Sequence, residues 1–546
     1  MTVRKEYDYV IIGSGSAGSV LAGRLSEDAA TSVLLIEAGP KDNSIYIKMP
    51  AALGVPLSNK RFNWYYHSEP DPNIGGRQIY EARGRVLGGS SSINGLNWVR
   101  GNPWDYDNWA AMGLRSWSYA HCLPYFKKAE TFSGGDRVYR GASGPMKIET
   151  CPAEGPLFEA FLESGRQAGY GYNEDHNAFR QEGIHRTQRN VFRGTRWNTA
   201  EAYLRQPGSR PNLTIMTDTL VSGFEMSNKR VVRVNGKSGS GPFSVDVGRE
   251  LILAAGTLNS PQLLMLSGLG DADDLRKLGI VVKGHLPGVG RNLMDHPTTM
   301  IQQSMEGGAS LASRLGPLGR MRIAAQWMLF RNGLGSSNYF ETGAFLRTRD
   351  AIKVPNMQYE FIPLMGEFHY GSFDLSEGFQ YFFALMRPTS RGRLWLASAD
   401  PTAPPKFVFN YLSTEEDRRD AVDSVKITRE IIAQAAWNRH RGQEVSPGPD
   451  VVTDDEILAY LRTAIGTQYH PCGTCRMGGD DLSVVDETGR VHDTDNLRVI
   501  DASIMPAIVS GNLNAPVIMM AEKLADNLRG RPPLEPEKAP YFHPDQ

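Results

Sequence analysis

The sequence predicts an α/β protein, α+β overall, that is divided into two large domains. Three observations lead to this fold class. Short apolar runs, typical of buried parallel strands, occur near both ends of the chain. Several of these runs lead into a glycine-rich turn and then into a segment whose apolar residues have helical spacing. The chain has 546 residues, more than a single hydrophobic core usually organises.

The first element is a strand, a glycine-rich turn and a helix. Residues 9–12 are apolar, and the run from Gly13 to Gly18 follows them. In such a turn the first glycine allows the bend, the second lets the backbone approach a pyrophosphate, and the third lets helix and strand pack closely. The helix N-terminus favours the anionic pyrophosphate. A second apolar run, 33–36, ends in Glu37, whose carboxylate can bind ribose hydroxyls.

This pattern predicts a Rossmann-like site for an adenine dinucleotide, FAD or NAD rather than NADP. A glycine-rich turn without a ligand is the structural alternative. The candidate binding residues here are Gly13, Ser14, Gly15, Ser16, Ala17, Gly18, Glu37 and Ala38.

Composition excludes several other classes of protein. The chain has 59 basic and 60 acidic residues and no basic block, which argues against a nucleic-acid partner. No apolar stretch approaches the roughly 20 residues of a membrane helix. No secretory signal is expected, because the first strand begins soon after Met1. With only four cysteines, we expect a cytoplasmic protein, with peripheral attachment to a membrane left open.

A loop rich in glycine and serine, residues 83–95, is the next informative segment. It cannot pack a core, but its backbone can approach a flat polar ligand closely and donate hydrogen bonds to it. A flexible surface loop is the alternative. The candidate ligand-binding residues in this loop are Arg83, Gly88, Gly89, Ser90, Asn94 and Gly95.

Later segments repeat the pattern of apolar strands and following helices seen at the start of the chain. Residues 213–216 and 220–224 predict strands, and 250–256 predicts a buried strand that leads into a helix. Residues 497–503 predict a strand that ends in an acid. A helix is expected over 514–528, and its N-terminus can stabilise negative charge on a bound ring.

The middle of the chain, residues 310–465, contains amphipathic and strand-like stretches and lacks a glycine-rich phosphate loop. We therefore expect a substrate domain there. The expected division is a cofactor domain from 1–155, 211–309 and 466–530, a substrate domain from 156–210 and 310–465, and a proline-rich tail, 531–546, that is extended and loosely held.

Of the eleven histidines, His470 has the most suggestive context, followed by a proline and small residues. A histidine is a natural proton acceptor for an alcohol at neutral pH, although an ordinary loop histidine is an equal alternative. We interpret His296 and His185 as structural or surface residues. Cys472 and Cys475 are interpreted as buried small side chains, because two further zinc ligands are missing and no metal site is expected.

Two asparagines precede the last helix. We interpret Asn512 as a turn or capping residue. Asn514 stands at the mouth of the helix, where its amide can meet the ligand that the helix dipole faces, or can simply cap the helix.

Together these segments resemble the glucose–methanol–choline family of flavin-dependent oxidoreductases, over residues 7–528. The glycine fingerprint, the 88–94 loop, 256–264, 470–474 and 501–506 carry the resemblance. Segments outside the shared motifs are most similar to the bacterial choline dehydrogenase branch and related FAD-dependent alcohol dehydrogenases, namely 61–64, 340–343, 441–448 and 511–515.

The resemblance implies FAD, and a substrate domain whose antiparallel sheet, flanked by helices, covers the flavin. It implies that His470 is the catalytic base and that Asn514 is the second member of the active-site pair. Where some members attach FAD through a histidine, this chain has Ile93, so the flavin is expected to be non-covalent. The further residues that the resemblance assigns to the cofactor are Trp64, Val221, Ala255, Gly256, Asp501, Ala502, Pro516 and Val517.

The implied reaction is oxidation of a primary alcohol to an aldehyde, with the hydroxyl proton passing to His470 and a hydride to flavin N5. A choline-type cation needs aromatic faces and an acid, and Tyr469, Tyr339, Phe340 and Glu341 can supply them. Trp98, in the active-site loop, is a further substrate candidate. Glu341 is equally interpretable as a buried structural carboxylate.

Several alternatives stay open. The enzyme can be an oxygen-using oxidase of an aromatic or heteroaromatic alcohol, such as a pyridoxine-type substrate, or a lyase on the same fold. A binding role without catalysis is the different-class alternative. The electron acceptor (quinone, dye or oxygen) and a homo-oligomeric state are also open.

Overall fold

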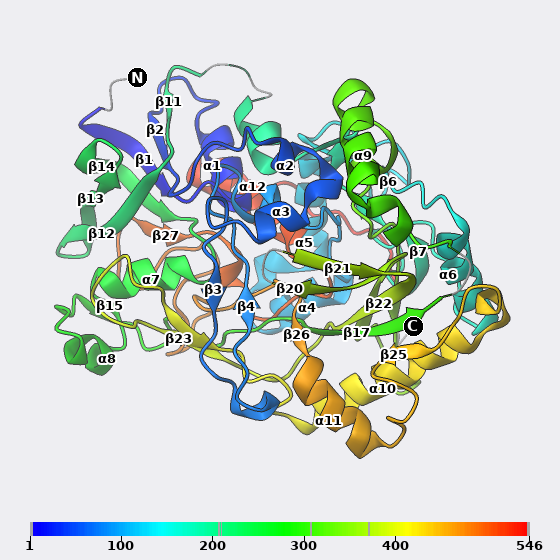
Figure 1. The fold of residues 1–546 in the computed structure, drawn as a ribbon. Helices are drawn as coiled ribbons and strands as arrows, with labels where there is room; N and C mark the ends of the chain where they lie inside the picture. Colours follow the sequence, from blue (N-terminus) through cyan, green and yellow to red (C-terminus); the bar gives the residue numbers. More distant parts are fainter. Residues whose placement is uncertain (1–3, 206–207, 209, 306–307, 370–371, 543–546) are drawn as a thin grey trace.

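The computed structural model describes residues 4–205, 208, 210–305, 308–369 and 372–542 (Figure 1). Two large sheets, each with seven strands in this part of the chain, occupy the two halves of the molecule. One sheet mixes parallel and antiparallel strands, and the other is antiparallel throughout. The predicted α/β class, α+β overall, is confirmed.

The first sheet is a parallel core extended by an antiparallel hairpin. Its strands, in spatial order, are β11 (Leu213–Met216), β2 (Val33–Ile36), β1 (Glu6–Ile12), β14 (Gly241–Leu253), β13 (Arg230–Ser238) and β12 (Thr219–Ser227), with β27 (Leu497–Val499) also paired to β14. The four residues of β2 are all buried, as expected of a parallel strand covered on both faces. Strands from the start, middle and end of the chain therefore build one sheet.

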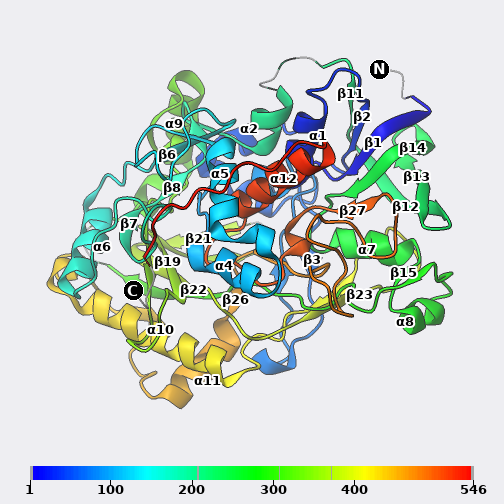
Figure 2. The same ribbon diagram turned by 180° about the vertical axis from the view of Figure 1, so that it is seen from behind.

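The glycine turn joins β1 to α1 (Ser16–Leu25) as predicted. Gly13 has φ +96°, a conformation that favours glycine. A Cβ on Gly18 would lie 1.8 Å from the carbonyl oxygen of Gly13, so only glycine permits this helix–strand contact. Helix α1 packs on α12 (Asn514–Leu528), which in turn packs on α5 (Tyr119–Ala129) (Figure 2).

The second sheet is entirely antiparallel. Its strands, in spatial order, are β25 (Glu444–Ser446), β17 (Pro297–Ser304), β22 (Gly378–Leu385), β19 (Met357–Ile362), β18 (Thr342–Leu346) and β7 (Gly183–Arg186), with β26 (Gly466–Thr467) also paired to β17. The helices of this half are α6 (Pro156–Gln167), α9 (Pro317–Phe330), α10 (Glu415–Ala433) and α11 (Asp454–Ala464).

Side chains alternate between the two faces of this sheet. On one face, aromatic residues of β19 and β22 form a core with α6 and with Trp437; Phe161 stacks on Phe361 at 5.0 Å and Phe379 on Trp437 at 4.1 Å. The intervening residues point the other way, into a cavity described below. They are Thr298, Met300, Glu360, Ile362, Gln380 and Phe382.

The sheet memberships bear on the domain boundaries, which remain a proposal. Strand β17 lies within 211–309 and β26 lies at the start of 466–530, yet both pair in the second sheet. We therefore propose that the second cofactor-domain segment ends at His296 and the third begins after Thr467.

The tail is extended but not loosely held, and that part of the expectation is wrong. Glu537 N–H donates to the Ala120 carbonyl at 2.9 Å, the Tyr139 hydroxyl to the Pro540 carbonyl at 2.6 Å, and Phe542 N–H to the Phe179 carbonyl at 2.7 Å. The chain end runs across the back of the molecule in Figure 2. Backbone hydrogen bonds of this kind are invisible in a proline-rich sequence.

Candidate active site

The two sheets enclose a large shared cavity of about 1810 Å³. This exceeds the volume of about 300–1,000 Å³ that is typical of small-molecule sites. One end lies against the glycine turn and α1, and the other against His470 and Glu360. The cavity therefore has room for an extended dinucleotide and a second, smaller molecule.

Most of the predicted cofactor residues line this cavity. They are Gly13, Gly15, Ser16, Ala17, Glu37, Ala38, Trp64, Arg83, Gly89, Ser90, Asn94, Gly95, Val221, Ala255, Gly256, Asp501, Ala502, Asn514 and Val517. Four others lie behind its wall, so a direct contact with a ligand is not supported for Ser14, Gly18, Gly88 and Pro516. Gly18 still holds the turn together, and Ser14 holds Glu37.

At the nucleotide end, Glu37 is fixed by its neighbours. Its carboxylate accepts from Ser14 Oγ at 2.6 Å, from Ser14 N–H at 3.1 Å and from Gly39 N–H at 2.9 Å. Burial raises the pKa of Glu37, although these donors oppose the shift. Gly15 precedes α1 without a side-chain cap, so the first N–H groups of this helix point free toward the cavity.

Asn514 belongs to the same end of the cavity. Its Oδ1 accepts from Ser16 Oγ at 2.7 Å, while its Nδ2 is buried and has no hydrogen-bond partner among the described residues. It stands at the first turn of α12, which also lacks a side-chain cap. An unpartnered donor beside an uncapped helix start fits an acceptor-rich ligand.

His470 lies at the other end, on the loop after β26, and Asn512 rather than Asn514 is its partner. Asn512 Nδ2 lies 3.2 Å from His470 Nε2. The prediction that Asn514 forms the active-site pair is therefore wrong by two residues. The tight turn at Gly511, with φ +119°, turns the Asn512 side chain toward His470 while Asn514 enters the helix.

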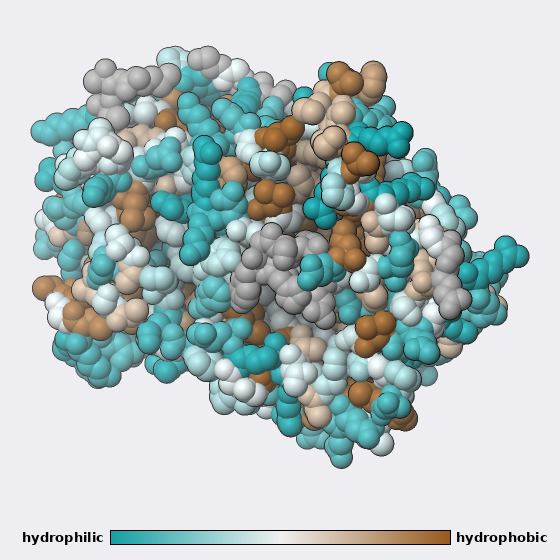
Figure 3. Space-filling view, in the orientation of Figure 1, coloured by the Kyte–Doolittle hydropathy of each residue, from teal (hydrophilic) through white to brown (hydrophobic). Residues whose placement is uncertain are grey.

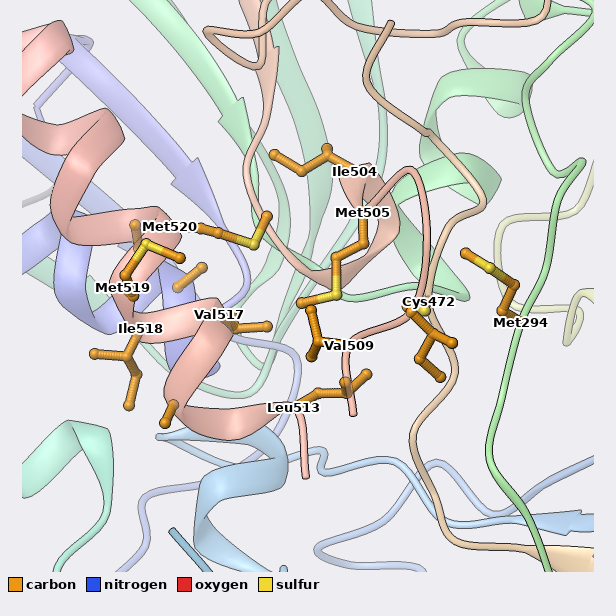
Figure 4. Packing of buried hydrophobic residues seen from close by; sticks show 14 of the residues in the cluster. Met294, Cys472, Ile504, Met505, Val509, Leu513, Val517, Ile518, Met519 and Met520 are labelled. Carbon is orange, nitrogen blue, oxygen red and sulfur yellow. The ribbon is translucent and has the colours of Figure 1, made fainter. Parts of the chain in front are cut away.

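Two further contacts fix His470 from behind. Its backbone N–H donates to Asp295 Oδ1 at 2.8 Å, and its Nδ1 lies 3.0 Å from His296 Nδ1. Figure 4 shows apolar packing around Cys472, two residues further along the same loop, where Met505, Val509 and Leu513 lie between the start of α12 and Cys472. Burial lowers the pKa of His470 well below its usual value, and His296 and Arg83 add to this, so the imidazole is neutral and able to accept a proton.

Glu360, on β19, also faces the His470 end of the cavity. Its Oε1 accepts from Asn97 Nδ2 at 2.5 Å and from Asn512 Nδ2 at 3.4 Å. Burial raises the pKa of this carboxyl. The aromatic rings of Tyr339, Phe340, Phe382 and Tyr469 line the same cavity, and an acid with aromatic faces suits a cation.

Two predicted substrate residues lie elsewhere. Glu341 does not line the cavity; its carboxylate accepts from Ala153 N–H at 2.8 Å and Ser337 Oγ at 2.5 Å, and pairs with Arg189 at 3.4 Å. Trp98 is fully buried, and its indole N–H donates to Glu130 at 2.8 Å. Both are structural, whereas Tyr339 and Tyr469 do line the cavity.

Sequence reasoning missed Glu360, Asn512 and His296. Asn512 was visible in the same loop as Asn514, but Gly-Asn also suits an ordinary turn. Glu360 lies in a strand whose alternation puts it on the cavity face, and that signal becomes readable only when the sheet partners are known. His296 carries no local signal, because its role depends on a loop 174 residues away.

Comparison with known families decides the class. The profiles of the N-terminal and C-terminal parts of the GMC oxidoreductase family match residues 7–298 and 388–521. The chain belongs to the GMC oxidoreductase family. The predicted class of FAD-dependent alcohol oxidoreductase is thereby confirmed.

Relatives match along the whole chain. The oxygen-dependent choline dehydrogenase of Staphylococcus xylosus is 45% identical over 99% of this chain and 98% of its own length. That of Pectobacterium carotovorum is 46% identical, over 98% of this chain and 97% of its own. Among solved structures, pyridoxine 4-oxidase from Mesorbium loti is 30% identical with a TM-score of 0.87, covering 96% of this chain and 100% of its own. A formate oxidase variant of Aspergillus oryzae is 25% identical with a TM-score of 0.90, covering 97% of this chain and 99% of its own.

The residues present fit FAD. The glycine turn, the uncapped starts of α1 and α12, and the orphan donor of Asn514 match a ligand with a pyrophosphate and a polar ring system. Across the described part of the chain, no group of three histidine, cysteine or acidic side chains has metal-binding geometry. Nor does any helix in that part combine the length and apolar character needed to cross a membrane.

Proposed function

We propose that this GMC oxidoreductase oxidises choline, or a closely related primary alcohol that carries a quaternary ammonium group, to the aldehyde. One observation carries the proposal: a neutral His470 and a buried Glu360 share the same end of the cavity, joined through Asn512. A base and an acidic side chain that face the same end of one cavity suit an alcohol whose other end is cationic. The similarity to choline dehydrogenases over nearly the full chain supports the same substrate class.

His470 acts as the base in this mechanism. In the structure its Nε2 lies 3.2 Å from Asn512 Nδ2, and the substrate hydroxyl takes the place of that donor when it binds. Nε2 then takes the hydroxyl proton, while the freed Asn512 N–H holds the substrate oxygen. Removal of the proton matters because an alkoxide expels hydride far more readily than an alcohol does. Bound FAD supplies the two-electron acceptor. The alcohol thus loses one proton and one hydride and becomes the aldehyde.

Glu360 and the surrounding rings orient the substrate. A quaternary ammonium cannot donate hydrogen bonds, so the protein can hold it only by charge and by aromatic faces. A bound cation favours the ionised form of Glu360 and so offsets the cost of burying that carboxylate. The cationic end is then fixed and the hydroxyl is directed at His470.

Several finer points are part of the same proposal. FAD is bound non-covalently, because Ile93, which lines the cavity, offers no nucleophile. The enzyme is a dehydrogenase that passes electrons to a quinone, dye or similar acceptor. We place it in the cytoplasm.

Anaerobic flavin reduction tests the substrate. Choline should bleach the flavin with a KM roughly 30-fold or more below that of 3,3-dimethylbutan-1-ol, its neutral isostere, as about 2 kcal/mol of desolvated cation binding requires. Equal values for the two alcohols would remove the role of Glu360. Reoxidation by air and by a soluble quinone, measured in the same samples, separates oxidase from dehydrogenase.

The second candidate is oxidation of a heteroaromatic alcohol. It is favoured by the 30% identity to pyridoxine 4-oxidase and by the aromatic lining of the cavity. Faster bleaching by pyridoxine than by choline would establish it. A yellow protein that no alcohol reduces would instead indicate a binding role.

A further inference from the structure

Helix α9 exposes its apolar side chains instead of burying them. Leu318, Met321, Met328, Leu329 and Phe330 are between 52% and 75% exposed. Within the helix only Trp327 is buried. Single exposed apolar residues are normal on a protein surface, but five on one helix indicate a surface that is covered by something else.

A second exposed apolar group lies across the cavity mouth from α9. Ile45 and Tyr46, on α2 (Ile45–Lys48), and Val55, on α3 (Gly54–Leu57), are 40–49% exposed and also line the cavity. Figure 3 shows brown residues gathered over α2, α3 and α9 on this face. Ile323 of α9 lines the cavity too. The exposed apolar residues of the three helices therefore flank the entrance to the active site.

The charged side chains around α9 in the sequence are all positive. Between residues 308 and 340 the sequence contains four arginines, Arg314, Arg320, Arg322 and Arg331, and no aspartate or glutamate. All four are exposed, although the whole chain has a net charge of only -1. Exposed apolar side chains flanked by arginines suit a surface that meets the headgroup region of an anionic membrane.

We propose that this surface, formed by the exposed residues of α2, α3 and α9 with the four arginines, docks on an anionic lipid bilayer. Helix α9 then lies in the headgroup region without crossing the bilayer, and the cavity mouth faces the lipid. A second copy of the chain is the poorer partner, because a two-fold contact would bring the arginine clusters of both copies together. Docking in this orientation would let a lipid-soluble electron acceptor reach the cavity from the membrane.

Sedimentation of the holoenzyme with vesicles tests this surface. The protein should co-sediment with vesicles that contain phosphatidylglycerol and much less with pure phosphatidylcholine. Leu329→Ser with Phe330→Ser should abolish binding, and Arg314→Gln should weaken it about fivefold, the effect of one basic residue near such a surface. The exposed pair Val281→Ser and Val452→Ser, away from α9, is the matched control and should bind normally.

Flavin reduction by choline in solution should be unchanged in these variants, since none of the substituted residues lines the cavity. Absence of vesicle binding by the wild type would overturn the proposal. So would light scattering that shows a dimer which Leu329→Ser with Phe330→Ser converts to a monomer, because the surface would then bind a second copy.

Behind His470, a second histidine carries an independent inference. His296 is buried, does not line the cavity, and has its Nδ1 3.0 Å from His470 Nδ1. Two imidazole nitrogens at this distance can hydrogen-bond only if one of them carries a proton.

The neighbours decide which nitrogen is protonated. Asn512 Nδ2 can only donate, so His470 Nε2 accepts, and in the neutral ring Nδ1 then carries the proton. The orientation of the Asn512 amide is consistent, because its Oδ1 accepts from Gln358 Nε2 at 3.1 Å. His470 Nδ1–H therefore donates to His296 Nδ1.

His296 must then carry its own proton on Nε2. This Nε2 is buried and has no hydrogen-bond partner of good geometry among the described residues, but the backbone carbonyls of Met386 and Val509 act on the ring and raise its pKa, which suits a protonated Nε2. Burial nevertheless lowers the pKa of His296 to about 3, so the ring stays neutral. We propose that His296 is a positioning residue that holds His470 in the tautomer whose Nε2 lone pair faces the substrate hydroxyl.

This role depends on the proposed base His470, and two variants of His296 test it separately. Leucine at this position is similar in size to histidine but has no hydrogen-bond acceptor, whereas glutamine keeps one. His296→Leu should slow flavin reduction about 100-fold with KM changed less than about threefold, and His296→Gln should recover at least tenfold of that loss.

Equal rates for the Leu and Gln variants, with normal FAD content, would overturn the positioning role. An unimpaired His470→Ala enzyme would instead refute the proposed base. The two failures are therefore distinguishable.

Discussion

The two ends of the cavity are built in different ways. The nucleotide end is built mainly from a backbone turn and a helix start that lie close together in sequence, around Gly13 and Glu37, and Asn514 at the start of α12 joins it from the far end of the chain. The catalytic end is made from single side chains on four separate segments, with His470, Asn512, Glu360 and His296. Local geometry specifies the first end, and only tertiary packing specifies the second.

The difference also appears in how each end tolerates change. At Gly13 and Gly18 the turn fails when a side chain is added, because the clash is with main-chain atoms that cannot move aside. A constellation of side chains fails group by group, and each loss has its own kinetic signature. The predictions below use this contrast.

The largest effect is expected at the catalytic end. His470→Ala removes the base but leaves the nucleotide turn intact, so FAD content should be normal. Anaerobic flavin reduction should fall about 10³-fold or more. A variant that bleaches its flavin with choline at the wild-type rate would contradict the mechanism.

The two neighbouring asparagines should separate the two ends of the cavity. Asn512→Ala should slow flavin reduction about 100-fold with FAD retained, because it removes the partner of His470. Asn514→Ala should instead weaken FAD retention, with a smaller effect on the reduction rate of the loaded enzyme. If the phenotypes are exchanged, the assignment of Asn512 is wrong. FAD content by absorbance and stopped-flow bleaching measure both.

At the nucleotide end, one added methyl group should be enough to weaken FAD binding. Gly18→Ala places a Cβ 1.8 Å from the Gly13 carbonyl oxygen, so the turn must open and FAD affinity should fall roughly 10-fold or more, as expected of 1–3 kcal/mol of overpacking. Gly239→Ala is the matched control, because no atom lies within 4 Å of its new Cβ. Thermal release of FAD measures both; equal release temperatures would exclude the packing role of Gly18.

The smallest effect concerns pH. Burial raises the pKa of Glu360, so its charge, and with it choline binding, is present above that pKa and is lost as the pH falls through it. The pKa of His470 is lowered, so the base stays active below pH 6.5. The acid limb of kcat/KM should therefore lie at higher pH for choline than for 3,3-dimethylbutan-1-ol. Glu360→Gln should make the two limbs coincide.

The same contrast explains what could be predicted from sequence. Residues 9–18 and 33–37 predicted β1, α1, β2 and their turn because each signal lies within a few residues. The last helix was predicted at 514–528, the bounds the structure has. The second sheet was expected only through family resemblance, since its strands are brought together from residues 183 to 467.

A site residue could be predicted from the sequence only where its signal lies in the neighbouring residues. His470 was visible because Pro471 and Gly473 mark an unusual loop. Glu341 was a candidate because it stands beside aromatic residues in sequence, but Glu360 stands between Tyr359 and Phe361 as well. Only the structure shows that Glu341 pairs with Arg189 while Glu360 faces the cavity. No local pattern distinguishes a carboxylate on the cavity face of a strand from one that is used for packing.

The order of the strands has a consequence for how the protein is made. Strands β1 and β2 leave the ribosome long before β27 and α12, which complete the same sheet and its covering layer. Until then the nascent chain carries an apolar strand edge and a dinucleotide turn without its covering helix. Cofactor loading is therefore expected only after β27 and α12 have emerged, and chaperones that shield unpaired edges should matter more for this enzyme than for one whose nucleotide fold is contiguous.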